Sequence, residues 1–136
     1  MSITVYIHLN EERNSQFDVK LFNEDISTKY LGTNMEVSIT ARNFDICWEN
    51  YSKQYQFELR MDRNRCTFAI EYFNSYDELY ELYELYEFAR FIAWLRSYFD
   101  EDKKVILLYE TDCSQLNLSC DKTIDDIKKW LEETFG

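Results

Sequence analysis

The stretch from Ser75 to Phe99 constrains the fold more than any other part of the chain, because it contains neither glycine nor proline. Ser75 and Glu78 match a capping box, in which the serine hydroxyl accepts a hydrogen bond from a backbone N–H and the glutamate reaches back to the serine N–H. A helix over this stretch would be roughly 36 Å long at about 1.5 Å per residue. Such a helix can cross a small domain, so we expect the rest of the chain to pack around it.

Two opposite arcs of this predicted helix differ in chemistry. One arc of a helical wheel collects apolar residues, which we assign to the core: Leu79, Leu82, Leu85, Phe88, Ala89, Ile92 and Ala93. The other arc mixes large aromatic side chains with charged ones: Tyr80, Tyr83, Glu84, Glu87, Arg90, Phe91 and Trp94. An ordinary solvated helix surface would carry lysine, glutamate and glutamine instead.

Three interpretations of the aromatic–acidic arc stay open at this point. Strands or the C-terminal segment cover it, so that its aromatic rings belong to the core. Alternatively it forms the seam of a homodimer, or it is a docking surface, since tyrosine and tryptophan are preferred interface anchors and the glutamates would meet basic groups. For docking, the candidate partner-binding residues are Tyr80, Tyr83, Glu84, Glu87, Phe91 and Trp94, with the acidic loop Asp100, Glu101 and Asp102.

Alternation of apolar and polar residues predicts strands before this helix. These segments are 3–9, 17–21, 35–42, 44–48, 54–61 and 66–72, with 17–21 as the returning strand of a hairpin. After the helix, the apolar run Val105–Tyr109 predicts a strand buried on both faces, and a short edge strand can follow at 116–118. Thr123 caps a last helix with two aspartates in its first turn.

These elements predict one α+β domain over residues 1–136. Its sheet is an antiparallel meander of about six strands, because the connections between successive strands are short and polar. The long helix and the short C-terminal helix are expected to pack on one face of that sheet, leaving the other face wet.

The charge of the chain restricts its partners. Fifteen basic residues against 26 acidic ones give a formal net charge of −11. Charge of this size repels nucleic acids and anionic membranes and speeds the encounter with basic proteins. The chain has no run of about 18 apolar residues and its start lacks the features of a signal peptide. We therefore expect a cytoplasmic protein that binds neither nucleic acid nor membrane.

Motifs for catalysis or for holding a cofactor are not found in the sequence. The chain has two glycines and one histidine, His8, which lies on the polar side of a predicted strand. Cys47, Cys66, Cys113 and Cys120 form no Cys-x-x-Cys pair and fit no zinc pattern, so we expect them to be buried, reduced thiols. We predict no enzyme, no metal site and no cofactor. Cys113 and Cys120 could approach each other across a turn, and whether they pair stays open at this point.

In size, acidity, aromatic content and lack of catalytic motifs, the chain resembles bacterial toxin-immunity proteins, in particular those of contact-dependent growth inhibition systems. The resemblance is one of overall character and carries no individual residue over. It implies a protein that binds one cognate toxin domain, often a nuclease, and neutralises it. An acidic–aromatic surface covering a basic active site would serve this role. Two alternatives stay open: a phage-type nucleic-acid mimic or anti-defence inhibitor, and a self-associating structural or adaptor domain.

Overall fold

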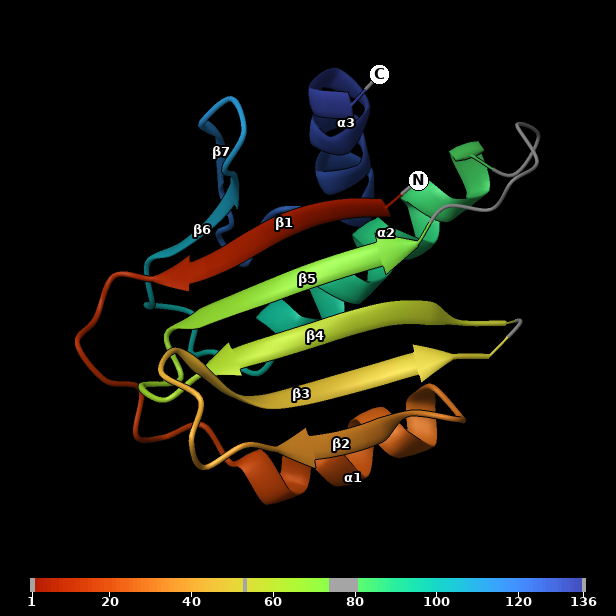
Figure 1. Cartoon of the computed structure of the whole chain (residues 1–136). Helices are drawn as coiled ribbons and strands as arrows, with labels where there is room; N and C mark the ends of the chain where they lie inside the picture. Colours follow the sequence, from red (N-terminus) through yellow and green to blue (C-terminus); the bar gives the residue numbers. More distant parts are fainter. Residues whose placement is uncertain (1, 53, 74–80, 136) are drawn as a thin grey trace.

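One antiparallel sheet of seven strands runs through the computed structural model, which describes residues 2–52, 54–73 and 81–135. In space the strands follow the order β2-β3-β4-β5-β1-β6-β7 (Figure 1). Their bounds are β1 Ser2–Leu9, β2 Asn34–Val37, β3 Phe44–Tyr51, β4 Gln56–Asp62, β5 Thr67–Phe73, β6 Val105–Tyr109 and β7 Ser114–Asn117. The three described helices are α1 Val19–Lys29, α2 Glu81–Arg96 and α3 Ile124–Phe135. The predicted α+β class is confirmed, with seven strands in place of about six.

Strand β1 lies inside the sheet, between β5 and β6, and pairs antiparallel with both. Strands β2 to β5 form the predicted meander, whose pairings are all antiparallel. Strand β6 enters after α2 has crossed behind the sheet, and the short edge strand expected near residues 116–118 is β7. The two ends of the sheet are therefore the short strands β2 and β7.

The prediction of a strand at 17–21 is wrong, because this segment begins helix α1. Asp18 is the N-cap, and its side chain accepts a hydrogen bond from the Leu21 N–H at 3.0 Å. Phe22 and Ile26, four residues apart, lie on one helix face and are fully buried. The four-residue spacing of Phe22 and Ile26 outweighs the short alternation of 17–21, because burying both side chains against the sheet stabilises a helix.

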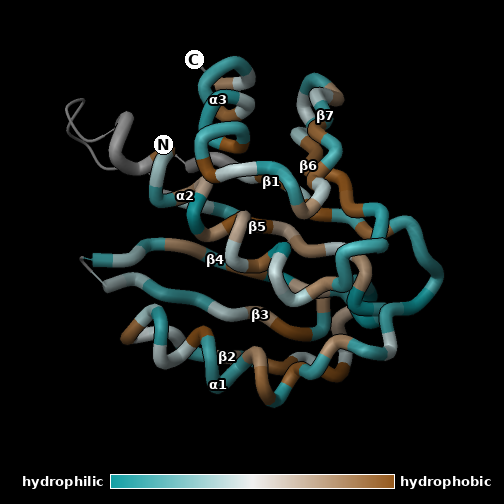
Figure 2. Tube along the Cα trace, turned by 180° about the vertical axis from the view of Figure 1, so that it is seen from behind, coloured by the Kyte–Doolittle hydropathy of each residue, from teal (hydrophilic) through white to brown (hydrophobic). Residues whose placement is uncertain are grey.

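The core lies between one face of the sheet and the helices. In register across four strands, Trp48, Leu59, Ile70 and Val5 oppose one another and are all fully buried. Seen from behind, α1, α2 and α3 lie in front of this face (Figure 2). Helix α3 packs against α2 and buries Ile127, Trp130 and Leu131. The helices therefore share one face of the sheet, as predicted.

Helix α2 carries the predicted core arc where its side chains are described. Phe88, Ala89 and Ile92 are buried, and Leu85 and Ala93 are partly buried against the core. The expected capping box at Ser75 and the core residue Leu79 lie outside the described residues. None of the helices within the described ranges combines the length and the hydropathy that crossing a membrane requires.

Candidate functional site: the open face of the sheet

The aromatic–acidic arc of α2 is only partly exposed where the structure describes it: Arg90 is exposed, whereas Phe91 is buried. Tyr80 lies outside the described residues, as do the side chains of Tyr83 and Glu84. Phe91 is 0% exposed, so its prediction as a partner-binding residue is wrong. Its ring centroid lies 4.9 Å from that of Phe57, within the core.

Trp94 is also drawn into the aromatic packing between α1 and α2. Its ring stacks on Phe22 with centroids 5.3 Å apart and meets Tyr98 edge-on at 5.2 Å. The Nζ of Lys29 lies 5.8 Å from the ring centroid, in cation–π range. Helix α1 thus covers part of this arc, which agrees with the interpretation that its rings belong to the core, although the covering element is α1 in place of strands or the C-terminal segment. Glu87 stays partly exposed and lies 3.6 Å from the guanidinium of Arg90.

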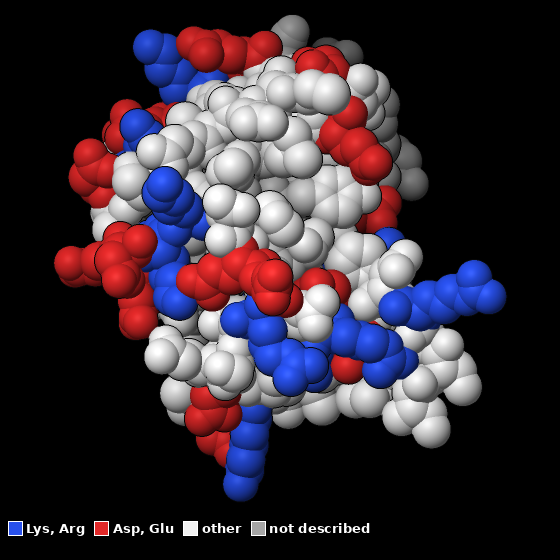
Figure 3. Space-filling view, turned by 90° about the vertical axis from the view of Figure 1, so that its left-hand side faces the viewer, with Lys and Arg blue, Asp and Glu red and all other residues white. Residues whose placement is uncertain are grey.

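The acidic loop Asp100, Glu101 and Asp102 is exposed, as expected for a docking element. The buried side chain of Arg96, at 4% exposure, supports the base of this loop. It donates hydrogen bonds to backbone carbonyls, among them those of Phe99 at 2.9 Å and Leu118 at 2.7 Å. The loop lies at the end of the sheet shown in Figure 3, where Lys and Arg side chains gather among carboxylates. The charge at this end is therefore mixed.

The second face of the sheet is covered by none of the described helices, and we call it the open face. Its residues alternate along the strands with the buried ones. On the four central strands they include Cys47 and Glu49 of β3, Glu58 and Arg60 of β4, Ala69 and Glu71 of β5, and Thr4 and Tyr6 of β1. Most of these side chains are partly exposed. The open face is thus a broad surface that solvent or a partner can reach.

Three carboxylates meet in register on the open face. Glu49 lies directly opposite Glu58, and Glu58 lies directly opposite Glu71 on the next strand. We call these three residues the glutamate row. Opposed side chains on antiparallel strands have Cβ atoms about 5 Å apart, and like charges in such pairs destabilise a sheet. The sequence does not dictate this alignment, since each of the three strands has other polar residues that a different register would bring opposite one another.

Arg60 provides partial compensation within the row. Its Nη2 lies 2.7 Å from Oε2 of Glu58, and the two side chains are 46% and 16% exposed. An exposed arginine in such a pair contributes little to stability. One guanidinium set among three carboxylates leaves the glutamate row with a net negative charge.

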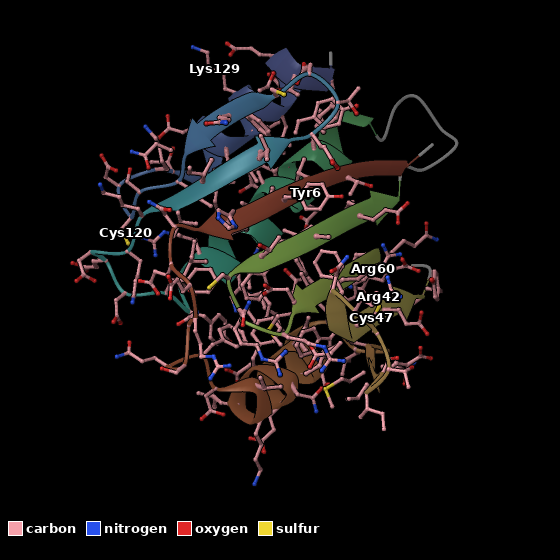
Figure 4. The ribbon with its side chains drawn as sticks, turned by 60° about the vertical axis from the view of Figure 1, so that its left-hand side comes forward. Tyr6, Arg42, Cys47, Arg60, Cys120 and Lys129 are labelled. Carbon is pink, nitrogen blue, oxygen red and sulfur yellow. The ribbon has the colours of Figure 1, made fainter. Side chains whose placement is uncertain are left out.

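Two tyrosine hydroxyls of the open face bond to carboxylates, and one of these carboxylates belongs to the glutamate row. The Tyr51 hydroxyl donates to Glu58, and this hydrogen bond, with a smaller effect of burial, raises the pKa of Tyr51. Burial raises the pKa of Tyr6, and a hydrogen bond to Glu110 adds to the effect. Figure 4 labels Tyr6 of β1, Arg60 of β4 and Cys47 of β3, which belong to the same open face. The combination of aromatic and acidic groups expected on α2 therefore exists on the sheet.

The open face carries a thiol beside its carboxylates, that of Cys47 on β3. Burial, followed by the charge of Glu58, raises the pKa of Cys47 to about 11. A thiol with this pKa stays protonated near neutral pH and is a poor nucleophile. Within the described residues, no three His, Cys, Asp or Glu side chains are grouped so that they could hold a metal ion. The face offers fixed acceptors for cationic groups.

Alternation along the sequence shows which residues lie on the polar side of each strand, but it does not show which of them become neighbours in the glutamate row. Glu58 and Glu71 fall within the predicted strands 54–61 and 66–72, and Glu49 directly follows 44–48, but only the registers of β3, β4 and β5 align them. The expectation of four buried thiols is wrong for Cys113 and Cys120, which are exposed and free. Exposed positions for these two follow from their place in the connections beside β7.

Comparison with known proteins gave no relative for this chain: no family model, no curated protein and no solved structure matches it. A function is therefore inferred from the geometry of the open face.

Proposed function

We propose that this protein is an inhibitor that binds one basic protein domain on its open face, and that the partner is a cognate bacterial toxin domain with nuclease activity. The observation that carries the proposal is the glutamate row, Glu49, Glu58 and Glu71 in cross-strand register. This row is unfavourable for folding by itself. Lysine or arginine side chains of a partner would relieve the repulsion, so the same feature favours a basic partner.

A nuclease is a suitable partner class because its substrate is polyanionic. The active site of such an enzyme is lined with basic groups, which an array of carboxylates can cover. Tyr51, at 59% exposure, and Tyr6 add aromatic groups beside the row, and tyrosine is enriched among residues that dominate binding energy. The net charge of −11 would speed the encounter with such a site.

The proposal is tested by capture followed by an inhibition assay. The tagged chain is used to retain proteins from lysate of the source cell at low and at high salt, and the retained protein is identified and assayed for nuclease activity with and without the chain. We expect one basic protein that stays bound at high salt and whose activity the chain inhibits. Retention of many basic proteins that all dissociate at high salt would contradict a dedicated partner.

Matched charge reversals locate the interface. The double variant Glu49→Lys/Glu71→Lys is compared with Glu12→Lys/Glu133→Lys, which changes the net charge equally at exposed positions away from the sheet. We expect the first variant to lose the partner and the second to keep it. Glu87→Lys tests the α2 surface separately. If Glu87→Lys alone abolishes capture, the interface lies on α2 and the proposed docking surface is wrong.

A further inference from the structure

Strand β2 is a sheet edge that is open to an added strand. The Ser38 N–H donates to the Asp45 carbonyl at 2.8 Å, in the same register that pairs Val37 with Ile46. Because inward and outward backbone groups alternate along an antiparallel strand, those of Asn34 and Glu36 face β3. The N–H and C=O groups of Met35 and Val37 therefore point away from the sheet.

Apolar side chains are concentrated at this edge. Residues 34–40 are all exposed, although the segment is apolar at every second position. Four of the exposed large hydrophobic residues belong to the segment 31–39: Leu31 at 70%, Met35 at 39%, Val37 at 57% and Ile39 at 86% exposure. Met35 and Val37 oppose Trp48 and Ile46, so they lie on the helix side of the sheet. Native sheets usually cover or charge such an edge, because it can pair with another chain.

The other side of the same edge is acidic. Glu36 lies opposite Cys47, and the neighbouring pair on this face is Asn34 with Glu49, the first member of the glutamate row. A strand added to β2 would thus meet apolar groups on its helix side and carboxylates on its open-face side. This two-sided chemistry specifies the alternation of the strand that fits.

A second copy of this chain fits the edge poorly. Each copy carries a net charge of −11, and pairing through β2 would place the Glu36 of both copies on one continuous face beside their glutamate rows. Like charges so arranged oppose association. A basic strand has the complementary charge.

We propose that the β2 edge binds an extended segment of a partner by strand addition, and that this segment alternates apolar with basic residues. Its backbone pairs with Met35 and Val37, its apolar side chains contact the helix side, and its basic side chains extend toward Glu36 and Glu49. Main-chain hydrogen bonds supply affinity in this mode, and the alternating side chains supply specificity. This inference deepens the proposed function and rests on it, since it defines how the basic partner enters the open face.

The test uses two capped peptides of equal composition, one alternating four lysines with four valines and one with the lysines and valines in separate blocks. Binding is followed by NMR, together with hydrogen exchange of the Met35 and Val37 amides. We expect the alternating peptide to bind about tenfold more tightly than the blocked one and to slow exchange at both amides. Equal binding of the two peptides would overturn the inference, and so would no binding by either.

A proline substitution isolates the edge. Val37→Pro removes one outward N–H and leaves the inward pairs of β2, and proline is tolerated at such edge positions. Gln115→Pro, on the opposite edge strand β7, is the matched control. The Leu118 N–H donates to the Val105 carbonyl, so the alternation of backbone groups along β7 directs the Gln115 N–H away from the sheet. We expect Val37→Pro to abolish the preference for the alternating peptide and Gln115→Pro to preserve it.

The outcomes separate this inference from the proposed function. If Val37→Pro still captures and inhibits the basic partner while Glu49→Lys/Glu71→Lys does not, the open face stands and strand addition is wrong. If light scattering shows a concentration-dependent dimer that Val37→Pro abolishes, the occupant is a second copy and the inference is overturned.

Discussion

Neutralising Glu49 should stabilise the fold, although it removes a group that we assign to the interface. Two unit charges about 6 Å apart repel by about 0.7 kcal/mol in bulk water and by about 2.8 kcal/mol at an effective dielectric constant of 20. Opposed pairs on sheets are worth about 0.2–1 kcal/mol, and Arg60 already offsets part of the charge of Glu58 at 2.7 Å. We therefore expect Glu49→Gln to raise the free energy of unfolding by about 0.5 kcal/mol.

The assay is equilibrium unfolding in urea, which is uncharged and leaves the ionic strength free to vary. It is run at about 0.01 M salt, where the Debye length is about 30 Å, and at about 1 M, where it is about 3 Å. The control is Glu12→Gln, which makes the same change in net charge at an exposed loop residue. The gain should be largest at low salt and should shrink at high salt.

Two results would refute this reasoning. If Glu49→Gln and Glu12→Gln change stability equally, the effect is one of net charge and the register of the row is irrelevant. If the gain persists at about 1 M salt, its cause is packing or hydrogen bonding. A confirmed gain combined with weaker partner binding would identify the row as a functional feature maintained at the expense of stability.

Three further predictions concern the core, the buried arginine and the thiol of the open face. Phe91→Ala should lower the free energy of unfolding by about 3–5 kcal/mol in urea titrations, because the ring is fully buried; a loss below about 1 kcal/mol would return Phe91 to the surface. Arg96→Met should cost about 3 kcal/mol, since carbonyls including those of Phe99 and Leu118 lose their donor, whereas Arg90→Met at an exposed site should cost less than about 0.5 kcal/mol. Cys47 should react with iodoacetamide at least about tenfold more slowly than exposed Cys113, measured by mass spectrometry of the labelled peptides, because its pKa is raised from 9.0 to about 11. Equal labelling rates for the two thiols would contradict the burial of Cys47. Because folding raises the pKa of this thiol, its contribution to the free energy of unfolding is present below pH 9.0 and is lost as the pH rises toward about 11.

Several elements could be predicted from the sequence because their periodicity is local. The alternation of 3–9 and of 44–48 gave strands β1 and β3, and the capped segment after Thr123 gave α3. The placement of the helices on one face followed from the same alternation. Segment 17–21 failed because its apolar residues alternate over too short a span, while the competing spacing of Phe22 and Ile26 gains its energy only by covering Trp48, whose ring lies 4.9 Å from that of Phe22.

The sequence by itself determined the class of the fold, the acidity of the chain and which residues of each strand are polar, because these depend on composition and on the backbone periods of about 2 and 3.6 residues. The tertiary structure decided which of these residues become neighbours. It buried Phe91 against Phe57, covered part of the α2 arc with α1, and aligned Glu49, Glu58 and Glu71. Strand register and helix packing join residues far apart in the chain, and the energies that select them come from burial of the whole core, to which no local pattern gives access.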